Sequence, residues 1–198
     1  SQALLEAGLA AVHDAFAVVR FFRADAMGED LFGTRADSIF IAGESAGGVI
    51  AAVAASFDPE DAFADARVTS YLRANGGVFG QVGAHRDVGS RIQGALALSG
   101  ATFDLGAVDE TSAPLYAAHD ALDPVVPCGT GPEGASFTGL VVSGSCELVP
   151  TWVQAGVAAE LFLLPDSDGH LSFDDREREI IYQEAAVFFH EQVLRAGG

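Results

Sequence analysis

Ser45 is the central residue of Gly43-Glu44-Ser45-Ala46-Gly47, a Gly-x-Ser-x-Gly sequence with an apolar run on either side. This order predicts a strand, a sharp turn and a helix, with the serine backbone strained and no room for a bulky side chain at either glycine. The hydroxyl then stands at a helix N-terminus, where backbone N–H groups, first that of Ala46, favour developing negative charge. The pattern predicts a nucleophilic serine, and its alternative is a glycine-rich turn whose serine only caps the helix.

A nucleophilic serine needs a base and an acid, which follow it in the chain order Ser, Asp or Glu, His in this kind of site. Asp123 follows the apolar run 115–119, and His170 follows a second run, 159–165. Such a histidine takes the serine proton, while the carboxylate fixes its tautomer and stabilises the imidazolium. We therefore predict Ser45, Asp123 and His170 as catalytic residues.

Other residues compete for the acid and base roles. Asp120 competes with Asp123, which is favoured because Pro124 stiffens the turn just after it; Asp120 could instead bind the turn backbone. His119 could line the site, but it precedes the acid. The remaining histidines are interpreted as helix, packing or loop residues: His13, His85 and His190.

These residues resemble the motifs of α/β-hydrolases of the carboxylesterase and lipase kind. Gly43–Gly48 matches the nucleophile turn of many carboxylesterases, and His119–Pro127 resembles the His-Gly-Thr-Ala-Asp-Pro-Val-Val-Pro loop of bacterial esterases. Asp168-Gly169-His170 resembles their histidine turn. The resemblance implies Asp123 as the acid and His170 as the base. The similarity to the longer type-B enzymes, which use Glu as the acid, stops at the nucleophile turn.

Strands that alternate with helices must position these residues. Helical spacing of apolar residues predicts helices over 3–26, 61–75, 146–157 and 174–195, and apolar runs predict strands over 38–42, 92–99, 115–119 and 161–164. The alternation implies a parallel sheet flanked by helices, with right-handed crossovers. Residues 58–91 are interpreted as an insertion, and their aromatic residues either line a cleft or simply pack: Phe57, which precedes it, Phe63, Tyr71 and Phe79.

The predicted fold is incomplete by itself. A full hydrolase of this kind has strands before the first helix, and one of their loops supplies a second oxyanion donor. Four strands leave one edge of a parallel sheet open, which is a liability. We therefore interpret residues 1–198 as the C-terminal portion of one catalytic domain, whose N-terminal segment is a partner, either as a separate processed chain or otherwise.

Composition limits the classes of partner. The chain has 28 acidic and 10 basic residues, all arginine, and a net charge of −18. That charge argues against binding nucleic acid or anionic membranes. We find no signal peptide, no long apolar span, no metal-ligand pattern and no cofactor motif, and so predict neither a transmembrane segment nor a cofactor.

The two cysteines, Cys128 and Cys146, bracket a Gly- and Pro-rich stretch after the acid. A disulfide between them would restrain this stretch and indicate a secreted or periplasmic protein; two free thiols are the alternative. The expected activity is hydrolysis of a small-molecule or polymeric carboxylic ester through an acyl-enzyme. The alternatives are a serine peptidase or amidase of the same fold, or a catalytically silent binding module.

Overall fold

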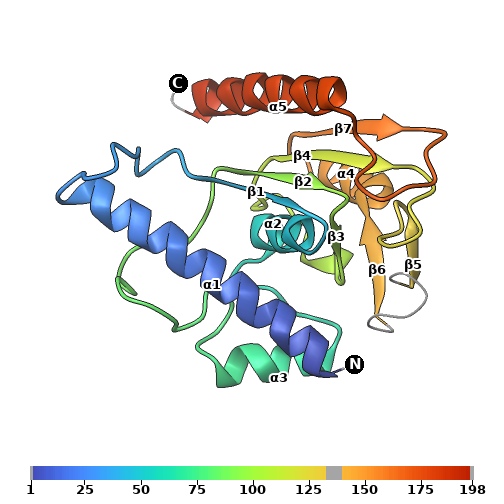
Figure 1. Ribbon diagram of the computed structural model, residues 1–198. Coiled ribbons are helices and arrows are strands. Elements are labelled where there is room, and N and C mark those ends of the chain that lie inside the picture. Colours follow the sequence, from blue (N-terminus) through green and yellow to red (C-terminus); the bar gives the residue numbers. More distant parts are fainter. Residues whose placement is uncertain (1, 133–139, 197–198) are drawn as a thin grey trace.

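The computed structural model describes residues 2–132 and 140–196 (Figure 1). In chain order its elements are α1 (Gln2–Met27), β1 (Phe40–Glu44), α2 (Ala46–Ser56), α3 (Ala66–Ala74), β2 (Gly94–Leu98), β3 (Ala101–Thr102), the 3-10 helix η1 (Leu105–Ala107), β4 (Leu115–Asp120), β5 (Thr130–Pro132), β6 (Val141–Gly144), α4 (Ser145–Gln154), β7 (Ala159–Leu164) and α5 (Asp175–Ala196).

The main sheet has the strand order β1-β2-β4-β7, and every neighbouring pair is parallel. This confirms the predicted parallel sheet flanked by helices and its four strands. Strands of one direction end at one edge of the sheet, so the loops that follow β1, β4 and β7 converge there. These are the three loops that carry the predicted catalytic residues.

Strand β2 shows how the sheet is buried on both faces. Ala95 and Ala97 pack into the core that contains α1, α2 and α4, whereas Leu96 and Leu98 pack into a second core against α5. Figure 1 shows the same layers, with α5 on one side of the sheet and α1 and α2 on the other. Because successive side chains of a strand point to opposite faces, an uninterrupted apolar strand fits between these two layers.

Helix α1 lies against α2 because its apolar residues recur at helical spacing. Its buried face is Leu5, Leu9, Val12, Phe16 and Val19. Near its C-terminal end the buried guanidinium groups of Arg20 and Arg23 extend this face with polar contacts. Arg20 donates to the carbonyls of Phe79 and Val82, and Arg23 donates to those of Ala36, Gly89 and Arg91. These bonds attach to α1 both the loop before β2 and, through Ala36, the segment before β1.

The same helix corrects one expectation from the sequence. By length and composition α1 is apolar enough to cross a membrane, and a third of its most apolar 18-residue window is buried inside the protein. A core helix of a soluble protein and a signal sequence both pass this test. The expectation of no long apolar span is therefore wrong, since α1 is one, although its buried face packs on the core.

Two segments differ from the sequence-based elements. Helix α3 begins at Ala66, later than expected, because the Asp65 side chain accepts a hydrogen bond from the Arg67 N–H and caps the helix there. The Gly- and Pro-rich stretch after the acid contains strands that we did not predict. β3, β6 and β5 form a small antiparallel sheet, and its strands of two to four residues are too short to show alternation.

Cys128 and Cys146 form a disulfide in this region, with their Cα atoms 5.0 Å apart. The Cys146 N–H also donates to the Cys128 carbonyl at 2.8 Å. The disulfide and this hydrogen bond therefore join the segment after β4 to the first turn of α4.

We predict that replacing both cysteines with serine lowers the free energy of unfolding by about 3 kcal/mol. The disulfide closes a loop over a sequence separation of 18, and the reduced chain loses that restraint on its unfolded state. Urea unfolding with and without reductant measures the difference. An unchanged unfolding midpoint in the double variant would contradict the prediction.

Candidate active site

The turn between β1 and α2 holds Ser45 in a conformation that few non-glycine residues adopt, with φ 54° and ψ −119°. The Ser45 N–H donates to the Leu98 carbonyl of the neighbouring strand at 2.9 Å. A Cβ atom at Gly43 would lie 2.2 Å from the Gly47 carbonyl oxygen. Glycine at position 43 is therefore required by space, as the sequence pattern predicts.

We also expected no room for a bulky side chain at Gly47, and this expectation is wrong. In the part of the chain that the structure describes, a Cβ atom at Gly47 would meet nothing within 4 Å. The crowded position is the next one. A Cβ at Gly48 would lie 2.6 Å from the Leu98 carbonyl oxygen, and one at Gly100 would lie 2.6 Å from that of Gly48. The start of α2 thus lies close to the end of β2, with Gly48 against Leu98 and Gly100. This close contact fixes the turn that carries Ser45.

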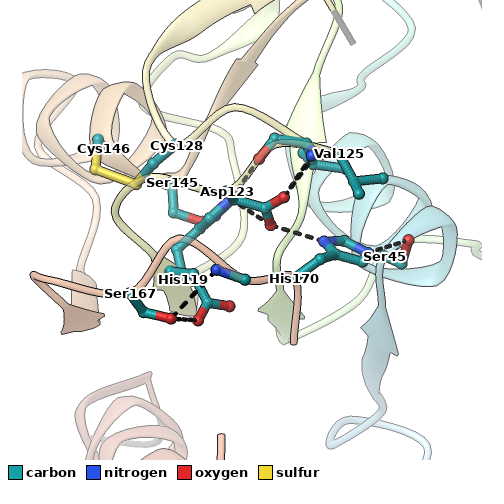
Figure 2. Close-up of polar contacts among 12 residues, drawn as sticks. Ser45, His119, Asp123, Val125, Cys128, Ser145, Cys146, Ser167 and His170 are labelled. Atoms are coloured by element: carbon teal, nitrogen blue, oxygen red, sulfur yellow. Dashed lines mark hydrogen bonds and ion pairs between the residues drawn. A yellow bond between two sulfur atoms is a disulfide. The ribbon is translucent and has the colours of Figure 1, made fainter. Parts of the chain in front are cut away.

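The structure brings Ser45, His170 and Asp123 together (Figure 2). His170 Nε2 lies 2.9 Å from Ser45 Oγ, and His170 Nδ1 lies 2.7 Å from Asp123 Oδ2. The Asp123 carboxylate is buried, whereas the His170 side chain is 19% exposed. Since a carboxylate only accepts, Nδ1 carries the proton and Nε2 is free to accept from the serine hydroxyl. The three groups can therefore move a proton away from Ser45.

The second oxygen of Asp123 is also occupied. Asp123 Oδ1 accepts hydrogen bonds from the N–H groups of Val125 and Val126 at 2.8 and 3.0 Å. Two backbone donors stabilise the ionised carboxylate and fix its plane relative to the imidazole.

Asp120 has a different position and different partners. It is the last residue of β4, and its carboxylate accepts from the Ser167 hydroxyl at 2.6 Å and from the Ser172 N–H at 3.2 Å. Both donors flank His170 in the chain. Asp120 thus restrains the loop that carries the histidine, and the structure gives it no hydrogen bond to the imidazole. Sequence reasoning missed Ser167 and Ser172, since neither position has a motif of its own.

His119 lies behind the acid loop and is fully buried. Its Nε2 lies 3.0 Å from the Val126 carbonyl, so Nε2 is the donor; Nδ1 then accepts from the Ser145 hydroxyl at 2.8 Å. Burial lowers the pKa of His119, which keeps the ring neutral. Its Nε2 is 3.6 Å from Asp123 Oδ2, beyond hydrogen-bond distance. His119 therefore supports the acid loop and does not contact Ser45.

Of the aromatic residues that we considered for a cleft, Phe57 is buried, whereas Phe63, Tyr71 and Phe79 are half-buried and pack against the core. The Phe57 and Phe63 rings are tilted relative to each other with centroids 4.5 Å apart, and Phe79 meets Phe16 edge to face at 5.0 Å. Tyr71 lies 5.7 Å from the buried His13 ring. These contacts fit packing, although Phe63 and Tyr71 also border hollows on the surface. Neither hollow includes a residue of the serine turn.

One group of carboxylates comes together only in the fold. Asp58, Asp61 and Asp109 each offer an oxygen within 4.8 Å of the others, and burial raises the pKa of Asp61 to about 6. The Asp58 carboxylate accepts from the Thr111 hydroxyl and pairs with Arg91. The group lies beyond the C-terminal end of α2, whereas Ser45 precedes its N-terminus, about 16 Å away for an 11-residue helix.

Comparison with known proteins gives the fold. No protein-family model matches the sequence, and no curated protein matches it. Among solved structures, a truncated carbohydrate esterase from gut microbiota superposes with a TM-score of 0.62 at 18% identity, over 91% of this chain and 67% of that one. A thermophilic esterase from Thermogutta terrifontis superposes with a TM-score of 0.58 at 16% identity, over 94% of this chain and 65% of that one. A carboxylesterase from Lactobacillus plantarum superposes with a TM-score of 0.58 at 17% identity, over 92% of this chain and 68% of that one.

These similarities identify the α/β-hydrolase fold, which this chain shares with the three esterases. At 16–18% sequence identity, these similarities are evidence for the fold alone. The chain spans about two thirds of the length of these three esterases.

The two aspartates are distinguished by a pair of asparagine variants. Asp123→Asn should lower kcat about 10⁴-fold, because an amide at this position favours the wrong histidine tautomer. Asp120→Asn should cost far less activity, and should lower the free energy of unfolding by about 1–3 kcal/mol because a charged acceptor is lost. Steady-state ester hydrolysis and urea unfolding of both variants measure this. A larger loss of kcat for Asp120→Asn would reverse the assignment.

Proposed function

We propose that the protein is a serine hydrolase that cleaves carboxylic esters through an acyl-enzyme. The observation that carries this proposal is the unbroken hydrogen-bonded series from Ser45 Oγ through both nitrogens of His170 to Asp123, at 2.9 and 2.7 Å. The strained serine at a helix N-terminus and the esterase fold support it.

In the proposed mechanism Ser45 Oγ attacks the ester carbonyl carbon while His170 Nε2 takes its proton. Asp123 holds the Nδ1 proton and stabilises the imidazolium that forms. His170 then donates the proton to the departing alkoxide, which leaves the acyl group on Ser45. A water molecule, deprotonated by the same nitrogen, attacks the acyl carbon, and His170 then returns that proton to Ser45 Oγ as the bond to the acyl group breaks. This step releases the acid and the free serine.

When Ser45 attacks, negative charge develops on the ester carbonyl oxygen, and hydrogen-bond donors must stabilise it. Ala46 is the first residue of α2, so its N–H has no acceptor within the helix. We propose this N–H as one oxyanion donor, with the helix dipole adding to its effect.

Activity against esters separates this proposal from its alternatives. A peptidase or amidase of the same fold would turn over p-nitroanilides at rates comparable to the matching p-nitrophenyl esters, whereas we expect turnover of the esters alone. A silent module would leave Ser45 unlabelled by a fluorophosphonate probe.

We predict that Ser45→Ala lowers ester hydrolysis at least about 10³-fold, since the covalent route is lost, while the fold is retained. Kinetics with a p-nitrophenyl ester and a thermal unfolding curve measure the two effects. Asp168→Ala, which removes a carboxylate near His170 in the chain but outside the hydrogen-bonded series, is the control. Residual activity above about one part in a thousand in Ser45→Ala would exclude Ser45 as the nucleophile.

We also propose a secreted or periplasmic location and a neutral or cationic substrate. The disulfide is compatible with secretion. The net charge of −18 disfavours anionic substrates and anionic surfaces.

A strand from the same hydrolase, in our proposal, lies along the open side of β1. In the described residues β1 pairs only with β2, and its Ala42 and Glu44 are exposed. Apolar side chains of β1 and α5, including Ile41 and Phe189, form a hollow of about 610 Å³ beside this edge. An apolar strand with one unpaired edge is prone to pair with another chain. The added strand would also bring a second oxyanion donor near Ser45.

This proposal makes a prediction for residues 1–198 expressed alone. The isolated chain should aggregate and should hydrolyse esters about 10²- to 10³-fold more slowly than the natural protein, the typical cost of one oxyanion donor. Light scattering and kcat for both preparations measure this. A soluble, monomeric isolated chain of full activity would refute the proposal.

A further inference from the structure

An apolar pocket lies directly beside the nucleophile turn. Its volume is about 290 Å³, and its walls come from the start of α1, the first turns of α2, Phe103 after β3, and β6. Among the described residues, none of the side chains that line it is polar. Two of the residues that line it, Gly8 and Ala46, are exposed to solvent.

Resting on the proposed function, we propose that this pocket binds the acyl chain of the ester, and that the substrate carries an uncharged aliphatic acyl group of several carbons. The residues that define it are Leu4, Gly8, Ala46, Val49, Phe103 and Val142.

The position of the pocket relative to Ser45, His170 and Asp123 indicates that it receives the acyl part of the ester and not the alcohol part. His170 Nε2 must reach the departing alkoxide, so the alcohol lies on the side of the histidine and acid loops. Neither loop contributes a residue to the pocket, whereas Ala46 does. The acyl group stays attached to Ser45 Oγ beside Ala46, so it is the part of the ester that can enter the pocket.

The volume of the pocket and its apolar walls limit which acyl groups can bind there. At roughly 30 Å³ for a water molecule, the pocket has the volume of about ten waters, which suits an aliphatic chain of about four to eight carbons. A charged acyl group would lose its hydration among apolar walls without gaining a partner. An acetyl group would leave most of the pocket unfilled.

Gly8 offers a way to fill the pocket with little disturbance of the fold. A Cβ atom there would meet nothing within 4 Å, and the residue lies inside α1, where leucine and alanine are both better helix formers than glycine. Gly8→Leu therefore places a side chain in the pocket, and Gly8→Ala is the matched control, since it makes the same backbone change with little added volume.

The experiment compares p-nitrophenyl acetate, butyrate and hexanoate with the full natural protein and both variants. In the wild type, kcat/KM should rise about fourfold for each added methylene until the pocket is full, which corresponds to burial of about 0.8 kcal/mol per CH₂. Gly8→Leu should lower the hexanoate-to-acetate ratio of kcat/KM at least about tenfold, and Gly8→Ala should leave it within about twofold of the wild type.

Two results would overturn the pocket assignment while the triad stands. One is acetate turnover and fluorophosphonate labelling of Ser45 with no dependence on chain length. The other is an unchanged chain-length preference in Gly8→Leu together with lower thermal stability, which would mean that another part of the protein fills the pocket. Absence of both labelling and turnover in the wild type would instead refute the proposed function, and the acyl pocket with it.

Discussion

The parallel direction of β1, β4 and β7 is the constraint on which the site depends. Ser45, Asp123 and His170 are far apart in the sequence, and each follows one of these strands. Only because the strands share a direction do their following loops meet at one edge of the sheet. The two apolar layers that bury the sheet are thus also what holds the three polar groups within 3 Å of their partners. Figure 2 shows the three loops converging.

Each loop is then restrained by contacts of its own. The serine turn is fixed by the close approach of Gly48 to β2, and the acid loop by backbone donors to Asp123 and by the buried His119 ring. Asp120 holds the histidine loop from the end of β4. Asp120, at the end of β4, and Asp123, in the loop that follows, therefore make different contacts: Asp123 contacts the imidazole, and Asp120 holds the loop that carries it. Such supporting contacts keep a proton-transfer geometry within the small tolerance that catalysis requires.

The sequence predicts the parts of this structure that have strong local patterns. The parallel strands and the helices around them follow from apolar runs and helical spacing, and the strained serine follows from its glycines. Patterns fail where the determining contact is not local. In the small sheet, β3 pairs with β6, which comes much later in the chain, and the crowding at Gly48 arises from β2 and Gly100. Asp120 binds two serines of the histidine loop, and His119 binds Ser145 at the start of α4, and no spacing in the sequence could reveal these contacts.

The most direct measurement of the central proposal is rapid-quench mass spectrometry of the protein during hydrolysis of a p-nitrophenyl ester. A covalent intermediate should accumulate within the burst of p-nitrophenol, and peptide mapping should locate the acyl group on Ser45. Hydrolysis at full rate with no acylated peptide, or with the acyl group on another residue, would contradict the account.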